Sequence, residues 1–393
     1  MMRIAHVLDA EVGWEQRLGM EHLLDRLPGE RFAQHLFDVE PGRKSRAAGF
    51  NPRGDPRETA LYESAEGRRA STIIERIPAI ARLAPFTGAL LGRRIRSRRI
   101  DIVHAWGTYA ATAARSVHDR PVVLTLYDPR VAARKVKLLR TLAKSPGFAV
   151  SCSTETVRRR LIEGGFPPEQ SAVIRPGVDF GLINKIRRGD LRRRLGVGED
   201  EFLCLVPAPV TRESGAFEAV YAVALRRRLC GGHRVIVPGE SWESERIVRF
   251  QRGLPITSPI VVAPRGVPFE QLLAVADALL ITPRGDISTT AIAWAMAAGA
   301  GVIGTAVYAV AEIIAHGVNG LLFKQTPGRS MSGAIYRLLE QRDRLGKTRE
   351  AARGQAYEVF GLRRYAEQMM RLYENVKAGR AAAEGIPDAA MGA

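Results

Sequence analysis

The segment Ala276–Phe323 constrains the fold of this chain most, because its pattern is that of a strand, a helix and a second strand in succession. The run Ala278–Thr282 is apolar and has the length of a buried strand. An Ala-rich helix is expected from Ser288 to Ala298, and Gly299 stands at the C′ position, where glycine commonly ends a helix. The run Gly301–Thr305 predicts the next strand. This βαβ unit favours an α/β protein with parallel sheets.

The start of the expected helix is a candidate anion site. Asp286, Ser288 and Thr289 are residue types that cap helix N-termini. A helix that begins at the carboxyl end of a parallel strand presents free N–H groups and the positive end of its dipole, and such a position accepts phosphate. A further helix is expected to begin at Glu312 and to end near His316. The sequence thus predicts a site for a phosphorylated ligand.

The order and spacing of these residues resemble the retaining glycosyltransferases of family 4, group 1 enzymes with the GT-B fold of two facing Rossmann-like domains. The C-terminal signature of that family contains Glu-Gly-Phe-Gly, a second Glu on the following helix, Ala-Met-Ala, a glycine and a later Glu. The corresponding positions are Asp286, Trp294, Ala295–Ala297, Gly299 and Glu312. The resemblance implies an α/β protein of GT-B fold that transfers a sugar from a nucleotide-sugar donor and requires no metal or other cofactor.

The resemblance also assigns roles to single residues. Asp286 is implied as the catalytic residue on the donor sugar, and His104 and Trp106 are implied on the acceptor side. The implied donor-binding residues are Gly13, Tyr127, Arg212, Ser214, Arg284, Gly285, Ser288, Thr289, Thr290, Trp294 and Glu312. For His104, a role in the core is an equal alternative.

Several of these positions depart from the family pattern. Trp294 stands where the family has a Glu, and an indole cannot accept hydrogen bonds from ribose hydroxyls. Ser214 stands where the family has a charged residue that stabilises the departing diphosphate. Arg212 and Arg284 are close enough in sequence to replace that charge. Two interpretations stay open: an active transferase, and a catalytically silent relative that binds a ligand or a partner glycosyltransferase.

The length of 393 residues suits two domains better than one core. We expect an acceptor-side Rossmann-like domain over residues 1–178 and a nucleotide-side one over 179–360. The resemblance implies that a helix over 361–377 packs back on the first domain, and 378–393 is expected to be a frayed tail. The stretch 41–57 is rich in Pro, Gly and Arg and is expected to be an exposed loop.

The formal net charge of +18 is the second strong feature. Arginine runs such as Arg158–Arg160 and Arg226–Arg228 are interpreted either as solvated helix faces or as a surface for an anionic partner. The segment Val131–Lys144 mixes apolar and basic residues in the manner of a helix that lies on a membrane surface. Nucleic acid is not expected, because aromatic residues make up only 7% of the chain and no binding motif is present. The sequence assigns no oligomeric state.

The remaining sequence signals concern location. Cys152, Cys204 and Cys230 are far apart and are expected to be buried thiols in a reducing compartment, with no metal site. The uncharged stretch Ile287–Ala311 is long enough to cross a bilayer, but it is rich in Ala and Gly and is expected to be a buried helix and strand. The chain begins directly with a strand pattern, Arg3–Leu8, and lacks the apolar region of a signal peptide. We therefore expect a cytoplasmic protein, peripheral on the inner face of the membrane if the basic surface is functional.

Overall fold

The computed structural model describes most of the chain. The described residues are 1–8, 12–40, 73–78, 84–114, 119–128, 130–207, 210, 212–238, 242–252, 259–263, 267–283, 287–324 and 329–387. The expected loop over 41–57 lies outside them. The chain divides into two compact units: Met1–Gly177 together with Leu362–Ala390, and Val178–Gly361.

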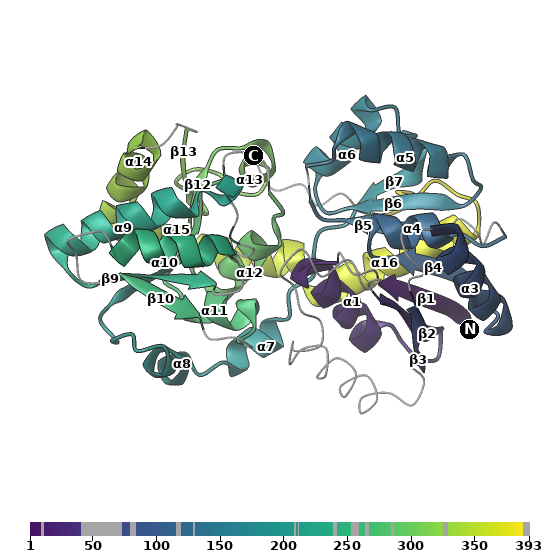
Figure 1. Cartoon of the computed structure of the whole chain (residues 1–393), viewed down its shortest axis with the longest axis horizontal. Coiled ribbons are helices and arrows are strands. Elements are labelled where there is room, and N and C mark those ends of the chain that lie inside the picture. Colours follow the sequence, from purple (N-terminus) through teal and green to yellow (C-terminus); the bar gives the residue numbers. More distant parts are fainter. Residues whose placement is uncertain are drawn as a thin grey trace. The chain divides into compact units, whose positions relative to one another are not determined.

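The first unit is built on a seven-stranded parallel sheet in the order β3-β2-β1-β4-β5-β6-β7 (Figure 1). Its strands are β1 (Met2–Leu8), β2 (Phe32–Glu40), β3 (Ile73–Pro78), β4 (Ile102–Ala105), β5 (Val122–Leu126), β6 (Phe148–Cys152) and β7 (Ser171–Val173). Its helices are α1 (Trp14–Arg26), α3 (Ala84–Ser97), α4 (Thr108–Ala114), α5 (Ala133–Ala143), α6 (Glu155–Glu163) and α16 (Leu362–Lys377).

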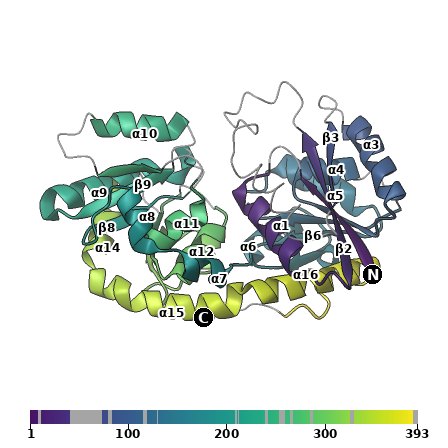
Figure 2. The ribbon, with the colours of Figure 1, turned by 90° about the horizontal axis from the view of Figure 1, so that it is seen from below.

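Helices cover both faces of this sheet, which explains why its strands are apolar along most of their length. Successive side chains of a strand point to opposite faces. In β1, Ala5 and Val7 belong to a core cluster with residues of α3, α4, α5 and α6, whereas Ile4 and Leu8 belong to a second cluster with residues of α1 and α16. Figure 2 shows α16 and α1 beside one another on the first unit.

The described residues after α16, 378–387, are anchored, which corrects the expectation of a frayed tail for this part; 388–393 lie outside the described residues. The Ala382 N–H donates to the Glu169 carbonyl (2.7 Å), and the Gln368 side chain donates to the Pro387 carbonyl (3.0 Å). The Asn375 amide donates to the carbonyls of Ala382 and Glu384. Residues 378–387 therefore belong to the packed first unit.

The second unit is built on a six-stranded parallel sheet in the order β10-β9-β8-β11-β12-β13. Its strands are β8 (Phe202–Leu205), β9 (His233–Pro238), β10 (Ile260–Ala263), β11 (Ala278–Ile281), β12 (Gly301–Thr305) and β13 (Leu321–Phe323). Its helices are α7 (Phe180–Lys185), α8 (Arg188–Arg194), α9 (Ala216–Cys230), α10 (Trp242–Arg252), α11 (Phe269–Val275), α12 (Thr290–Ala298), α13 (Tyr308–Ala311), α14 (Arg329–Glu340) and α15 (Arg342–Phe360). Helices α9, α10 and α14 share a core with one face of the sheet, and α12 packs against α11, α15 and α7.

The structure corrects two element predictions in this unit. The helix expected to begin at Glu312 instead ends there: α13 spans Tyr308–Ala311, and Glu312 is its C-cap. His316 does not close a helix, since its Nδ1 accepts from the Leu322 N–H (2.9 Å). The uncharged stretch 287–311 does form the helix α12 and the buried strand β12. Within the described part of the chain, no helix is both long and apolar enough to cross a bilayer.

The basic helix expected on a membrane surface is α5, and its apolar side is already occupied. Val136, Leu139, Leu142 and Ala143 are buried in the core of the first unit. Its exposed side chains are mainly basic, and most of its apolar side chains already pack in the core. Cys152 and Cys204 are buried free thiols, whereas Cys230 is exposed, contrary to the prediction.

Candidate functional site

The strand order of the second sheet has a switch point between β8 and β11. From β8 the chain proceeds outward through β9 and β10, and it returns to the other side of β8 to lay down β11, β12 and β13. At such a point the connections after two neighbouring strands leave in opposite directions, and ligands of open α/β sheets bind there at the carboxyl ends of the strands. Helix α9 follows β8, and helix α12 follows β11.

The loops at this switch point are joined by Thr282 and Gly215. Thr282 follows β11, is fully buried, and donates through Oγ1 to the carbonyls of Gly215 (3.0 Å) and Ser214 (3.3 Å). Gly215 is the N-cap of α9 and adopts a left-handed conformation, with φ of 67°. A Cβ atom at this position would overlap the Thr282 carbonyl oxygen. The start of α9 therefore lies directly against the end of β11.

The start of α12 completes this edge. Thr289 is the N-cap but makes no side-chain cap bond, and the Thr290 N–H instead approaches Ser288 Oγ (3.3 Å). The N–H groups in the first turn of a helix have no acceptor within the helix. Ser288 is partly exposed, whereas Thr289 and Thr290 are buried. The structure thus brings Ser214, Ser288, Thr289 and Thr290 to one edge of one sheet, as neighbours of two helix N-termini.

Other donor-side candidates lie elsewhere or outside the described residues. Arg284, Gly285 and the candidate catalytic Asp286 are outside them, and of Arg212 only its place in the 3₁₀ turn Arg212–Ser214 is described. Glu312 follows the adjacent strand β12 as the C-cap of α13 and is partly exposed.

Trp294 lies inside the second unit and is fully buried. It belongs to α12, whose residues from Thr290 to Ala297 are all buried. Trp294 is therefore closed to solvent in this structure, and the donor-binding role implied for it stays a prediction.

In the first unit, Gly13 is exposed at the N-terminus of α1, beyond the carboxyl end of β1. Strands β1 and β4 flank the switch point of this sheet. His104, Trp106 and Tyr127 are at most 2% exposed, and they lie together in the core. None of the three is open to solvent, and the acceptor-side and donor-side roles implied for Trp106 and Tyr127 stay predictions. For His104 the core alternative is the one observed.

These buried side chains form a polar network. The rings of His104 and Trp106 are stacked, with centroids 4.1 Å apart. His104 bonds the Tyr373 hydroxyl through Nδ1 (2.7 Å) and the Thr125 hydroxyl through Nε2 (2.8 Å). Trp106 Nε1 donates to Nδ1 of His6 (3.2 Å). Burial lowers the pKa of His6 to about 4 and also lowers that of His104. Both rings are therefore neutral at physiological pH.

Part of the arginine excess is structural. Arg192 is buried, and its guanidinium bonds Asp277 (3.2 Å) and the carbonyls of Val275 and Gly198. Arg227 pairs with Glu201 (2.8 Å), and Arg226 pairs with Glu340 and lies over the Tyr336 ring. These arginines hold loops and helix ends of the second unit. Their position in runs such as Arg226–Arg228 did not distinguish them from solvated residues.

Sequence reasoning missed Thr282, which joins the two loops, and the buried partners His6 and Tyr373. Gly215 was the available signal for the contact made by Thr282, because a glycine directly before a helix often marks a close approach of two backbone segments. No sequence signal marked the buried network of His6 and Tyr373, since Tyr373 lies far from the other members along the chain. Among the described residues, no group of three His, Cys, Asp or Glu side chains is arranged to hold a metal ion.

Solved structures with the same fold cover nearly the whole chain. The Anabaena protein HepE in complex with UDP-glucose matches with a TM-score of 0.75 at 17% identity, over 94% of this chain and 98% of that one. Sucrose-phosphate synthase from Thermosynechococcus elongatus matches with a TM-score of 0.74 at 14% identity, over 96% of this chain and 100% of that one. At these identities the likeness shows the fold, and the predicted two-domain, Rossmann-like GT-B fold is confirmed.

Sequence comparisons give the family. A D-inositol 3-phosphate glycosyltransferase of Geodermatophilus obscurus is 28% identical in an alignment of length 264, which covers 63% of this chain and 56% of that protein. The chain thus spans just over half the length of that relative. The family described as Glycosyltransferase Family 4 matches residues 25–181, and the family described as Glycosyl transferases group 1 matches residues 216–341. Together these two matches cover most of both units, and the chain belongs to the family 4, group 1 glycosyltransferases.

Proposed function

We propose that this protein transfers a sugar, with retention of configuration, from a nucleotide-sugar donor whose diphosphate binds at the carboxyl edge of β8 and β11. The joined loops at Gly215 and Thr282 carry this proposal. They hold the N-terminus of α9 against the end of β11, from which the chain leads to the N-terminus of α12. Two helix N-termini at one edge supply N–H groups and positive dipole ends for a diphosphate. The HepE structures with UDP and UDP-glucose support this choice of ligand.

The chemistry assigned to single residues follows the family resemblance. Asp286 contacts the donor sugar, and the first turn of α12, from Ser288 to Thr290, receives the diphosphate. As the glycosidic bond breaks, negative charge grows on the leaving diphosphate, and preorganised donors and positive groups lower that barrier. Ser214 supplies a hydroxyl in place of a charge, so Arg212 and Arg284 are the residues that neutralise the leaving group.

Calorimetric titration with UDP, GDP and ADP tests the donor site. At least one of them is expected to bind, and Ser288→Phe is expected to abolish binding because the ring fills the space before α12. The matched control is Ser97→Phe at the exposed end of α3, which should bind as the unmodified protein does. If none of the three nucleotides binds at millimolar concentration, the donor site is wrong.

A catalytically silent, ligand-binding relative is the second candidate, and the burial of Trp294 favours it. The position that the family uses for a ribose-binding carboxylate is here a fully buried indole. Release of free sugar from UDP-glucose, GDP-mannose or ADP-glucose distinguishes the two functions. Binding of nucleotide without turnover of the matching nucleotide-sugar, with any acceptor offered, would favour the silent relative.

We also propose that the exposed face of α5 brings the protein to an anionic membrane surface on the cytoplasmic side. Arg134, Lys137, Arg140 and Lys144 are exposed on this helix or at its C-cap. The helix contains no acidic residue. A surface of this kind binds through charge alone, because the apolar side of α5 lies in the core.

A further inference from the structure

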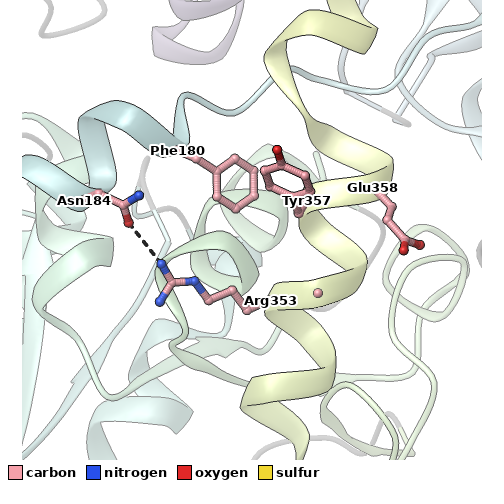
Figure 3. A pocket seen from close by; sticks show the side chains of 6 residues that line it. Phe180, Asn184, Arg353, Tyr357 and Glu358 are labelled. Carbon is pink, nitrogen blue, oxygen red and sulfur yellow. Dashed lines mark hydrogen bonds between the residues drawn. The ribbon is translucent and has the colours of Figure 1, made fainter.

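A surface pocket on the second unit is lined by α7 and α15, and none of its lining residues belongs to the loops that follow β8 and β11. Its lining residues are Phe180, Asn184, Arg353, Gly354, Tyr357 and Glu358, and its volume is about 480 Å³ (Figure 3). The pocket is open to solvent, since all of its lining residues except Phe180 are exposed. Every lining residue comes from the second unit.

Aromatic side chains form one wall of this pocket. The rings of Phe180 and Tyr357 meet edge to face, with centroids 5.3 Å apart and planes at 72°. Tyr357 is 70% exposed, and Phe180 is partly exposed. The edge-to-face contact with Phe180 orients the Tyr357 ring, so that an aromatic surface is held open to solvent. A single exposed aromatic residue is ordinary on a protein surface. Tyr357 differs, because a second ring holds it in place beside polar side chains although most of it is exposed.

Polar side chains form the second wall. Arg353 Nη2 donates to Asn184 Oδ1 (3.0 Å) across the gap between the helices (Figure 3). That bond fixes the guanidinium and leaves its other N–H groups and the Asn184 amide N–H groups able to donate. Arg353 and Glu358 carry opposite charges, so the lining has no formal net charge. A neutral ligand with several hydroxyl groups matches this wall better than an anion.

Gly354 is the third feature of the pocket. It lies inside α15, where a glycine costs about 1 kcal/mol relative to alanine. A Cβ atom at this position would meet nothing within 4 Å. Gly354 is exposed, so this part of the α15 surface, next to Arg353 and Tyr357, carries no side chain.

From these features we infer that the pocket binds a pyranose unit of a neutral oligosaccharide, at a site separate from the donor site. The apolar C–H face of the sugar ring stacks on Tyr357, because the negative face of an aromatic ring attracts the partly positive C–H groups. The ring hydroxyls accept from the Arg353 guanidinium and the Asn184 amide. A site of this kind holds a glycan chain on the protein. The choice of a glycan as ligand rests on the proposed function, whereas the pocket does not.

Binding to an array of neutral gluco-, galacto- and manno-oligosaccharides, with uronate oligosaccharides beside them, tests the inference. The unmodified protein is expected to bind at least one neutral oligosaccharide. Gly354→Phe, which fills the pocket, and Tyr357→Ala, which removes the aromatic wall, should each weaken that binding about tenfold or more. Gly346→Phe is the matched control, because Gly346 lies exposed on the same helix with nothing within 4 Å of its Cβ position and does not line the pocket.

Circular dichroism and thermal unfolding show whether each variant is folded. Absence of binding to every neutral oligosaccharide, preference for uronate chains, or equal loss in Gly346→Phe and Gly354→Phe would overturn the inference. The donor site is scored separately, by the nucleotide titration of unmodified protein and Ser288→Phe. Nucleotide binding without oligosaccharide binding rejects the pocket alone, and oligosaccharide binding without nucleotide binding rejects the donor site alone.

Discussion

His6 is held neutral by the donors and acceptors around it. The Trp106 indole N–H can only donate, so the Nδ1 atom of His6 that faces it must be an acceptor. Nε2 of His6 then carries the proton and donates to the Gln34 oxygen (3.1 Å), while the Gln34 amide donates to the Leu24 carbonyl (3.2 Å). A proton on Nδ1 would break the Trp106 bond and place a charge in the core, beside His104.

This arrangement predicts a loss of stability in acid. Unfolded His6 titrates near 6.5, whereas the folded pKa is lowered to about 4 by burial. The unfolded chain therefore takes up protons first, and stability falls as the pH falls from about 6.5 towards 4. A shift of this size corresponds to a loss on the order of 3 kcal/mol. Urea unfolding between neutral pH and pH 4, followed by tryptophan fluorescence, measures it.

The comparison variant is His6→Gln, which cannot titrate in this range. Its stability is expected to be lower at neutral pH, because the bonds to Trp106 and Gln34 are altered, and to depend less on pH. His104 contributes in the same direction, since burial lowers its pKa as well. An equal pH dependence in His6→Gln and the unmodified protein would contradict this account of His6.

At the scale of elements, the start of α9 depends on one glycine. Gly215→Ala forces alanine into the left-handed region, which costs about 1–2 kcal/mol, and its Cβ meets the Thr282 carbonyl. The variant should be less stable and lose nucleotide binding, because the loops after β8 and β11 no longer fit together. Chemical denaturation and calorimetry measure the two effects.

Gly346→Ala in α15 is the control for this glycine prediction. Gly346 lies within the helix with open space at its Cβ position, so alanine there should raise stability by up to about 1 kcal/mol. Nucleotide binding should not change. If Gly215→Ala also binds nucleotide as the unmodified protein does, the joined loops do not form the donor site.

Elements with a strong local pattern were predictable, and their surroundings were not. The apolar runs of β11 and β12 and the glycine after α12 gave strand, helix and strand in their observed places. The helix expected at Glu312 was wrong because the observed α13 is one turn long and precedes it. The burial of Trp294 and His104 results from packing with segments that are distant in sequence, and the local spacing of residues does not predict such contacts. The segment of α5 was correctly predicted to form a helix with exposed basic residues, but most of its apolar side chains pack in the core.

At the scale of the whole molecule, the chain repeats one arrangement in two units. Each has a parallel sheet with an internal switch point, between β1 and β4 in the first unit and between β8 and β11 in the second. In the second unit, the described residues at that edge include the small polar Ser214, Ser288 and Thr290. In the first unit, the large polar side chains near β4 and β5 are buried in a network. The proposed donor site therefore lies in the second unit.

The net charge of +18 predicts binding to anionic surfaces. Because the attraction is electrostatic, it falls off within a Debye length of about 8 Å at physiological salt. Each basic residue near an anionic bilayer contributes about 1 kcal/mol. We expect sedimentation with vesicles of phosphatidylglycerol and phosphatidylcholine, little sedimentation with pure phosphatidylcholine, and weaker binding as salt rises.

The location of that binding is tested by charge reversal on α5. The variant has four substitutions: Arg134→Glu, Lys137→Glu, Arg140→Glu and Lys144→Glu. It should no longer bind anionic vesicles but should stay folded, because these side chains are exposed. In the control, four exposed basic residues of the second unit are replaced by Glu, which changes the net charge by the same amount. These are Arg228, Arg249, Arg252 and Lys347. If both variants lose binding equally, net charge alone governs the attraction and α5 has no special role. If the unmodified protein sediments equally with neutral and anionic vesicles, the electrostatic mechanism itself is wrong.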